Sequence, residues 1–131
     1  HYTRGIAPMS SARSKVITRL QKDLSGRFRV VDNTGIDKTV LSGRIPDVIL
    51  YKKEPPNSTD VLFVMKIENG GELVDSLAQW KEIGALPATF YIVVPKDKLD
   101  DAKKLANATS VRARFAWYRI QNDELQELRY E

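Results

Sequence analysis

The sequence predicts an α/β domain in which a mixed central sheet is flanked by helices. Segments with helical apolar spacing alternate with short apolar runs along the chain, as in proteins whose helices pack on a sheet. The strand–helix–strand unit from 61 to 94 predicts a parallel crossover. Short turns between the two preceding strands predict antiparallel pairing. The chain has 131 residues and no linker long enough to divide it, so we expect one domain.

The first helix is predicted to follow a flexible arm formed by residues 1–9. Ser10 and Ser11 can cap this helix, because their hydroxyl groups accept hydrogen bonds from the free N–H groups of the first turn. Ser25-Gly26 is expected to end it. The apolar positions recur at helical spacing and are Val16, Ile17, Leu20 and Leu24.

Three strands are predicted in the first half of the chain, at residues 28–31, 46–51 and 61–67. Residues 32–44 are rich in turn-forming types, and Val40-Leu41 within them is expected to form an edge. Pro46 can only start a strand or lie on an edge, because it has no backbone N–H to donate. Residues 54–58 read as a hairpin loop. The third strand is the most apolar stretch and is expected at the centre of the sheet.

The second half is predicted to alternate helices and strands. Helices are expected at residues 72–84 and 99–108, and strands at 89–94 and 111–120. Residues 121–131 are predicted to form a charged tail that can include a short helix.

Composition and charge narrow the class of protein. The absence of cysteine excludes disulfides and cysteine-ligated metal sites, and it fits a cytoplasmic location. No apolar run approaches the roughly 20 residues of a membrane helix, so no membrane partner is expected. Residues 1–53 hold 11 Lys/Arg against 4 Asp (+7), and residues 54–131 hold 10 against 13 Asp/Glu (−3). The basic half suggests a polyanion such as DNA, with Arg13, Arg19 and Arg44 as contacts, or simply a basic solvated surface.

Charged side chains mark the ends of two predicted strands. Lys66 and Glu68 are two residues apart, so they point to the same face of the third strand. Asp47 begins the neighbouring strand, and a hairpin can bring it beside them. Charges at the end of a buried strand are costly unless they are paired or bind a metal. We therefore expect these three side chains to form one cluster.

Two interpretations of this cluster stay open. Asp47 and Glu68 can supply oxygen ligands to Mg²⁺ or Mn²⁺, with Lys66 stabilising charge or positioning the attacking water in phosphodiester hydrolysis. Alternatively, the residues have no catalytic role: Asp47 and Lys66 form a buried ion pair, or the charges simply mark a strand end where solvent begins.

Pro46-Asp47, followed after a hairpin by an apolar strand with alternate charges, resembles the PD-(D/E)xK restriction-endonuclease-like superfamily. The element order is similar to the αβββαβ core of that fold, over residues 10–120. Gln79 on the following helix resembles the glutamine of resolvase-like members. The resemblance implies a nuclease-like domain over residues 1–131, with Asp47, Lys66, Glu68 and Gln79 as catalytic residues and Mg²⁺ (or Mn²⁺) at Asp47 and Glu68. Such enzymes commonly dimerise.

The sequence departs from the family pattern at two places. The family has an acid where Lys66 stands and commonly a lysine where Glu68 stands. Many members also use an acid on the first helix, where this chain offers only Asp23, near the helix end. We therefore expect a metal-dependent DNA endonuclease, or else an inactive domain of the same fold that binds nucleic acid or a protein partner.

Overall fold

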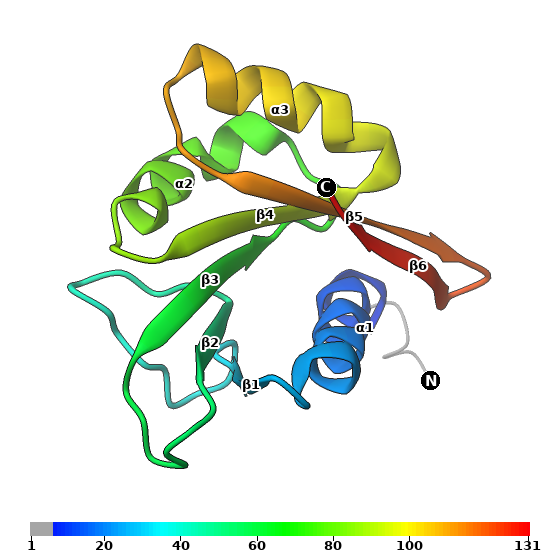
Figure 1. Cartoon of the computed structure of the whole chain (residues 1–131). Coiled ribbons are helices and arrows are strands. Elements are labelled where there is room, and N and C mark those ends of the chain that lie inside the picture. Colours follow the sequence, from blue (N-terminus) through cyan, green and yellow to red (C-terminus); the bar gives the residue numbers. More distant parts are fainter. Residues whose placement is uncertain (1–6) are drawn as a thin grey trace.

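The computed structural model describes residues 7–131, with side chains from residue 12 onward. Six strands form one mixed sheet in the order β1-β2-β3-β4-β5-β6, and helices cover both of its faces (Figure 1). The strands are β1 (Phe28–Asp32), β2 (Val48–Lys52), β3 (Val61–Ile67), β4 (Thr89–Pro95), β5 (Arg114–Gln121) and β6 (Glu124–Tyr130). The predicted α/β class with a mixed, helix-flanked sheet is confirmed.

Pairing within the sheet changes from antiparallel to parallel and back. The β1–β2 and β2–β3 pairs are antiparallel, β3–β4 and β4–β5 are parallel, and β5–β6 is antiparallel. The predicted parallel unit between 61 and 94 is therefore confirmed, as is the antiparallel pairing before it. β3 lies between β2 and β4, inside the sheet, as its apolar sequence predicts.

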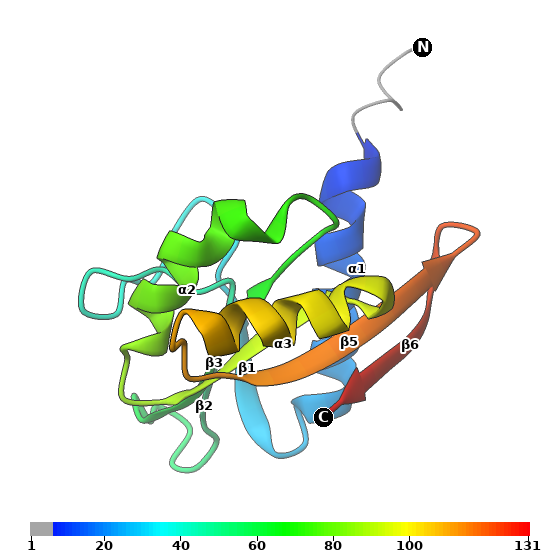
Figure 2. The same cartoon turned by 90° about the horizontal axis from the view of Figure 1, so that it is seen from above.

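The helices divide between the two faces (Figures 1 and 2). α1 (Ala7–Leu24) buries Val16, Ile17 and Leu20 against one face. α2 (Leu77–Gly84), preceded by the 3₁₀ turn η2 (Leu73–Ser76), packs on the other face together with α3 (Leu99–Ala108), which follows η3 (Lys96–Lys98). Within residues 7–131, no helix has the length and apolarity that crossing a membrane requires.

The start of the first helix differs from the prediction. α1 begins at Ala7, before the expected caps Ser10 and Ser11, and takes in the last part of the predicted arm. Pro8 is compatible with this position, because the N–H groups of the first turn have no partner inside a helix. The rest of the arm, residues 1–6, lies outside the described residues.

The charged tail is a strand, so its prediction as a tail with a short helix is wrong. β6 pairs antiparallel with β5 through a turn at Asn122 and Asp123, whose φ values are 53° and 63°. The register shifts between Arg119 and Ile120, so the inward residues Leu125 and Leu128 are three positions apart. This bulge hides the two-residue period of a strand and imitates a helical spacing.

The connection between β1 and β2 contains no further strand of the sheet. Leu41 and Arg44 form an isolated antiparallel bridge around Ser42 and Gly43, whose φ values are 50° and 80°. The expected sheet edge at Val40-Leu41 is therefore absent: Leu41 instead flanks a tight two-residue turn at Ser42 and Gly43.

Candidate functional site

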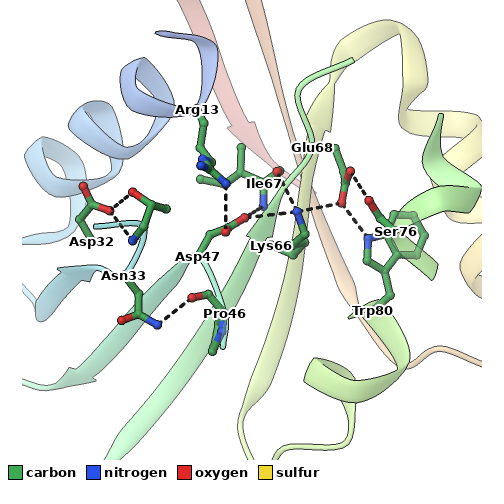
Figure 3. Close-up of polar contacts among 11 residues, drawn as sticks. Arg13, Asp32, Asn33, Pro46, Asp47, Lys66, Ile67, Glu68, Ser76 and Trp80 are labelled. Atoms are coloured by element: carbon green, nitrogen blue, oxygen red, sulfur yellow. Dashed lines mark hydrogen bonds and ion pairs between the residues drawn. The ribbon is translucent and has the colours of Figure 1, made fainter. Parts of the chain in front are cut away.

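The site lies where β2 begins and β3 ends. Asp47 immediately precedes β2, and Val48 pairs with Met65 of β3. The Asp47 N–H continues this pairing by donating to the Met65 carbonyl at 2.9 Å. Since antiparallel neighbours bring the start of one strand beside the end of the other, Asp47 lies next to Lys66 and Glu68 (Figure 3).

The Lys66 ammonium lies between two carboxylates. Its Nζ is 3.5 Å from Asp47 Oδ2 and 3.6 Å from Glu68 Oε2. The side chains are only 13%, 13% and 8% exposed for Lys66, Asp47 and Glu68. Charges this sheltered are weakly screened by water, so each needs an opposite charge nearby. The predicted cluster therefore forms, and the ammonium supplies its central positive charge.

Asp47 is held from two further directions. The Ile67 N–H donates to its Oδ2 at 2.8 Å, and Arg13 Nη1 of α1 lies 3.5 Å from its Oδ1. Both carboxylate oxygens therefore have a donor. The contact with Arg13 ties the first helix to the edge of the sheet.

Glu68 is held by the segment that follows it. Ser76 Oγ donates to its Oε1 at 2.7 Å, and Trp80 Nε1 donates to its Oε2 at 3.0 Å. The Tyr118 hydroxyl donates to the Glu68 backbone carbonyl. Burial, followed by the charges of Glu68 and Asp97, raises the pKa of Tyr118 above its ordinary value, so its hydroxyl keeps its proton, and this donor role, further into the alkaline range than a free tyrosine would.

A buried asparagine fixes the loop before Asp47. Asn33 Nδ2 donates to the carbonyls of Thr39 and Pro46, each at 2.9 Å, and its Oδ1 accepts from the Thr39 N–H at 2.7 Å. Asn33 is 2% exposed. The loop before Asp47 has no strand partner, so the Asn33 side chain supplies the hydrogen bonds that hold its backbone. This keeps Asp47 in a fixed position.

The residues present do not fit a divalent cation while Lys66 stays in place. Asp47 and Glu68 are oxygen donors of the kind Mg²⁺ prefers, but the atom they share is an ammonium nitrogen. Among residues whose side chains are described, no three of the types His, Cys, Asp and Glu are grouped to hold a metal.

The other predicted site residues make no hydrogen bond or ion pair with this cluster among the described side chains. Gln79 is exposed on α2, and Arg19 pairs with Asp23 at 3.1 Å within α1. Arg44 Nη1 donates to the Ser42 carbonyl at 2.8 Å. Its Nε is buried and has no hydrogen-bond partner among the described residues. Arg13, not Arg44, is the arginine that pairs with Asp47.

Sequence reasoning missed the residues that hold Glu68. Trp80 is fully buried in the core, and its hydrogen bond to Glu68 was not identified from the sequence. A buried indole N–H nearly always needs an acceptor, so a search for that acceptor among nearby polar residues is the signal that points to Glu68. The hydroxyl of Ser76 offers no comparable signal.

Together, the fold and the site define a mixed α/β domain with a sheltered Asp47–Lys66–Glu68 cluster at one edge of its sheet. In comparisons with known proteins, no family model, curated protein or solved structure matches the chain.

Proposed function

We propose that this chain is a restriction-endonuclease-like domain that binds nucleic acid without metal-dependent hydrolysis. The observation that carries the proposal is the position of Lys66 Nζ, 3.5 Å from Asp47 and 3.6 Å from Glu68. In a metal-dependent nuclease, a divalent cation occupies the place between such carboxylates. Here a tethered cation of the protein takes that place.

The charges of the cluster support this proposal. Arg13 and Lys66 are positive, and Asp47 and Glu68 are negative, so the four groups have no formal excess charge. A divalent cation placed there would meet an ammonium at short range. Moving Lys66 away would leave two sheltered carboxylates without their partner until the metal bound.

A groove beside the cluster supports an anionic ligand. It has a volume of about 690 Å³ and lies at the carboxyl ends of β3 and β4, where ligands collect in open α/β sheets. Lys96 and Arg119 bring positive charge to it, although Asp97 also lines it and Arg119 pairs with Glu127 at 3.0 Å. The full lining consists of Ala12, Asn69, Pro95, Lys96, Asp97, Tyr118, Arg119 and Ile120. Independently of the groove, the net charge of +7 on residues 1–53 favours a polyanionic partner.

The test combines DNA binding, plasmid nicking and calorimetric titration with Mn²⁺. We expect the wild type to bind DNA with an affinity that falls as salt rises, to leave plasmid intact and to bind no Mn²⁺. Lys66→Glu should gain Mn²⁺ binding, because it restores an acid between Asp47 and Glu68. Lys104→Glu on α3 makes the same charge change at an exposed position and should gain none. Mn²⁺-dependent nicking by the wild type, or no DNA binding at low salt, contradicts the proposal; the latter favours a protein partner.

A metal-dependent DNA endonuclease is the second candidate. Its support is that Asp47 and Glu68, at the ends of neighbouring strands, both lie within 3.6 Å of one atom, Lys66 Nζ. Two ligands of Mg²⁺ or Mn²⁺ must likewise converge on one point. This candidate requires Mg²⁺- or Mn²⁺-dependent plasmid nicking that disappears in Asp47→Ala and persists in Asp60→Ala, which removes an exposed carboxylate. Equal behaviour of wild type and Asp47→Ala excludes it.

A further inference from the structure

A row of four aromatic rings crosses the sheet on the face that carries α1. The ring centroids are 5.4 Å apart for Phe28 and Phe63, 6.0 Å for Phe63 and Tyr91, and 6.2 Å for Tyr91 and Tyr130. These residues come from β1, β3, β4 and β6, so the row runs from one edge strand to the other. We call these four residues the aromatic row.

The aromatic row is incompletely covered. α1 ends at Leu24, and beyond that end lies an open pocket of about 270 Å³ that all four rings line. Tyr130 is 41% exposed. A side chain that serves only the core would be covered more fully, since leaving apolar rings in contact with water forfeits their burial energy.

Positive charge surrounds the aromatic row. The Arg27 guanidinium lies 5.4 Å from the centre of the Phe28 ring and lines the same pocket. Lys52 pairs in register with Phe28, and Arg114 pairs with Tyr91. Because paired residues of adjacent strands point to the same face, both cations flank the rings. No ion pair joins Arg27, Lys52 or Arg114 to a carboxylate within the described side chains.

We infer that the aromatic row is a stacking platform for the bases of single-stranded nucleic acid, with Arg27, Lys52 and Arg114 placed for its phosphates. Single-strand binders combine these two elements, because every base has an aromatic face and every nucleotide an anionic phosphate. We favour nucleic acid as the ligand because of charge complementarity. An apolar protein segment would leave the three cations without an anionic partner. This inference rests on the proposed nucleic-acid binding and names its substrate class.

The platform is separate from the Asp47–Lys66–Glu68 cluster. Phe63 and Tyr91 are the third residues of the parallel strands β3 and β4, whereas the cluster lies at the carboxyl end of β3 and just before the start of β2. The rings also lie on the α1 face, and Glu68 contacts Ser76 and Trp80 on the α2 side. Substitutions in one site can therefore be tested without altering the other.

The test compares a fluorescent oligothymidylate with an abasic oligomer of equal length by anisotropy. Both carry the same phosphates, so the difference between them reports base stacking. We expect the wild type to bind the oligothymidylate more tightly by about five- to 150-fold for each stacked base. Tyr130→Leu and Phe28→Leu should reduce that ratio and leave the abasic affinity unchanged. Unchanged abasic affinity also shows that the variants are folded.

Phe115→Leu is the matched control, because Phe115 is a half-buried aromatic residue of the core on the opposite face. It should keep the wild-type ratio. A second readout is an oligomer containing 2-aminopurine, whose fluorescence should fall when the base stacks on the wild type and fall less with Tyr130→Leu.

The possible failures are distinguishable. Equal wild-type affinity for the oligothymidylate and the abasic oligomer overturns the platform and leaves the proposed nucleic-acid binding intact. The same holds if Tyr130→Leu and Phe28→Leu keep the full ratio. Absence of binding to single-stranded and duplex DNA at low salt overturns the proposed function itself, and the platform with it.

Discussion

Trp80 Nε1 donates to the same carboxylate oxygen of Glu68, Oε2, that lies 3.6 Å from Lys66 Nζ. The indole and the ammonium therefore share one acceptor, and Ser76 occupies the other oxygen. A carboxylate with fixed donors on both oxygens cannot rotate freely toward a new ligand. The helix that follows β3 thus fixes the Glu68 end of the cluster, as Arg13 and the Ile67 N–H fix the Asp47 end.

Ser76→Ala should destabilise the protein, because it removes a hydrogen bond to a sheltered charged group. Such bonds contribute roughly 1.5–3 kcal/mol, so we expect a fall in the free energy of unfolding in that range, measured by urea denaturation. Ser14→Ala on the exposed side of α1 removes a hydroxyl at an exposed position and should cost little. Equal effects of the two substitutions would contradict the role of Ser76.

Lys66→Met should be strongly destabilising, since it leaves Asp47 and Glu68 facing each other without the ammonium. Removing one partner of a buried ion pair costs roughly 3–5 kcal/mol, and the slight exposure of these groups places our expectation near the lower value. The double variant Asp47→Asn/Lys66→Met should lose less than the sum of the single variants. Additive losses in urea denaturation would show that the two side chains do not interact.

Asn33→Ala should loosen the loop that leads to Asp47. The substitution removes three hydrogen bonds and leaves the buried Pro46 carbonyl without its Asn33 donor. At about 1 kcal/mol for each bond, we expect a loss of about 3 kcal/mol and faster hydrogen exchange at Leu41 and Arg44. Asn57→Ala in the exposed β2–β3 loop is the control. Unchanged hydrogen exchange at both amides would show that Asn33 does not hold this loop in place.

Tyr118 should make the protein less stable in alkali. Burial raises the pKa of Tyr118 in the folded state, so above about pH 10 the unfolded chain releases this proton first and is favoured. The contribution of Tyr118 is complete below that pH and is lost as pH rises toward the folded-state pKa. Tyr118→Phe should therefore lose less stability than the wild type from pH 10 to 11, by up to about 1.4 kcal/mol per pH unit. Parallel alkaline curves would contradict this.

Asp123→Gly should stabilise the β5–β6 hairpin. Asp123 has a φ of 63°, a conformation that glycine adopts without steric cost. The lost ion pair with Lys15 is at an 85% exposed carboxylate and is worth little. We expect a higher melting temperature and a gain of about 0.5–1 kcal/mol. Asp101→Gly in the first turn of α3 should instead lose roughly 0.5–1 kcal/mol, because glycine is the poorer helix former and an acidic charge is favourable at a helix N-terminus.

Much of the fold follows from local sequence patterns. The strands β1 to β5 and the helices lie where apolar periodicity places them. Each helix buries one stripe of apolar residues, and each of these strands buries alternate apolar residues or a continuous apolar run. The strand β6 was missed because a bulge places Leu125 and Leu128 three residues apart. The start of α1 was predicted too late, because serine is a favourable N-cap residue and Ser10 and Ser11 therefore suggested a start that the helix does not use.

The site could be predicted only as far as strand pairing determines it. Asp47, Lys66 and Glu68 meet because a hairpin and a two-residue spacing bring them together. The pairing of Asp47 with Arg13 and not Arg44 depends on how α1 crosses the sheet. Local sequence contains no record of that crossing. For Trp80 and Glu68 the sequence offers only an indirect signal, because a buried indole N–H needs an acceptor.

The helix α1 packs against β6, so elements near the two ends of the described chain share one hydrophobic cluster. Val16 and Leu20 share a cluster with Leu128, and Lys15 lies 3.0 Å from Asp123 across the end of the hairpin. During synthesis, the first helix leaves the ribosome long before this partner strand exists. The strands β1 to β4 can cover part of its apolar stripe as they emerge, but the contact with Leu128 must wait until β6 emerges.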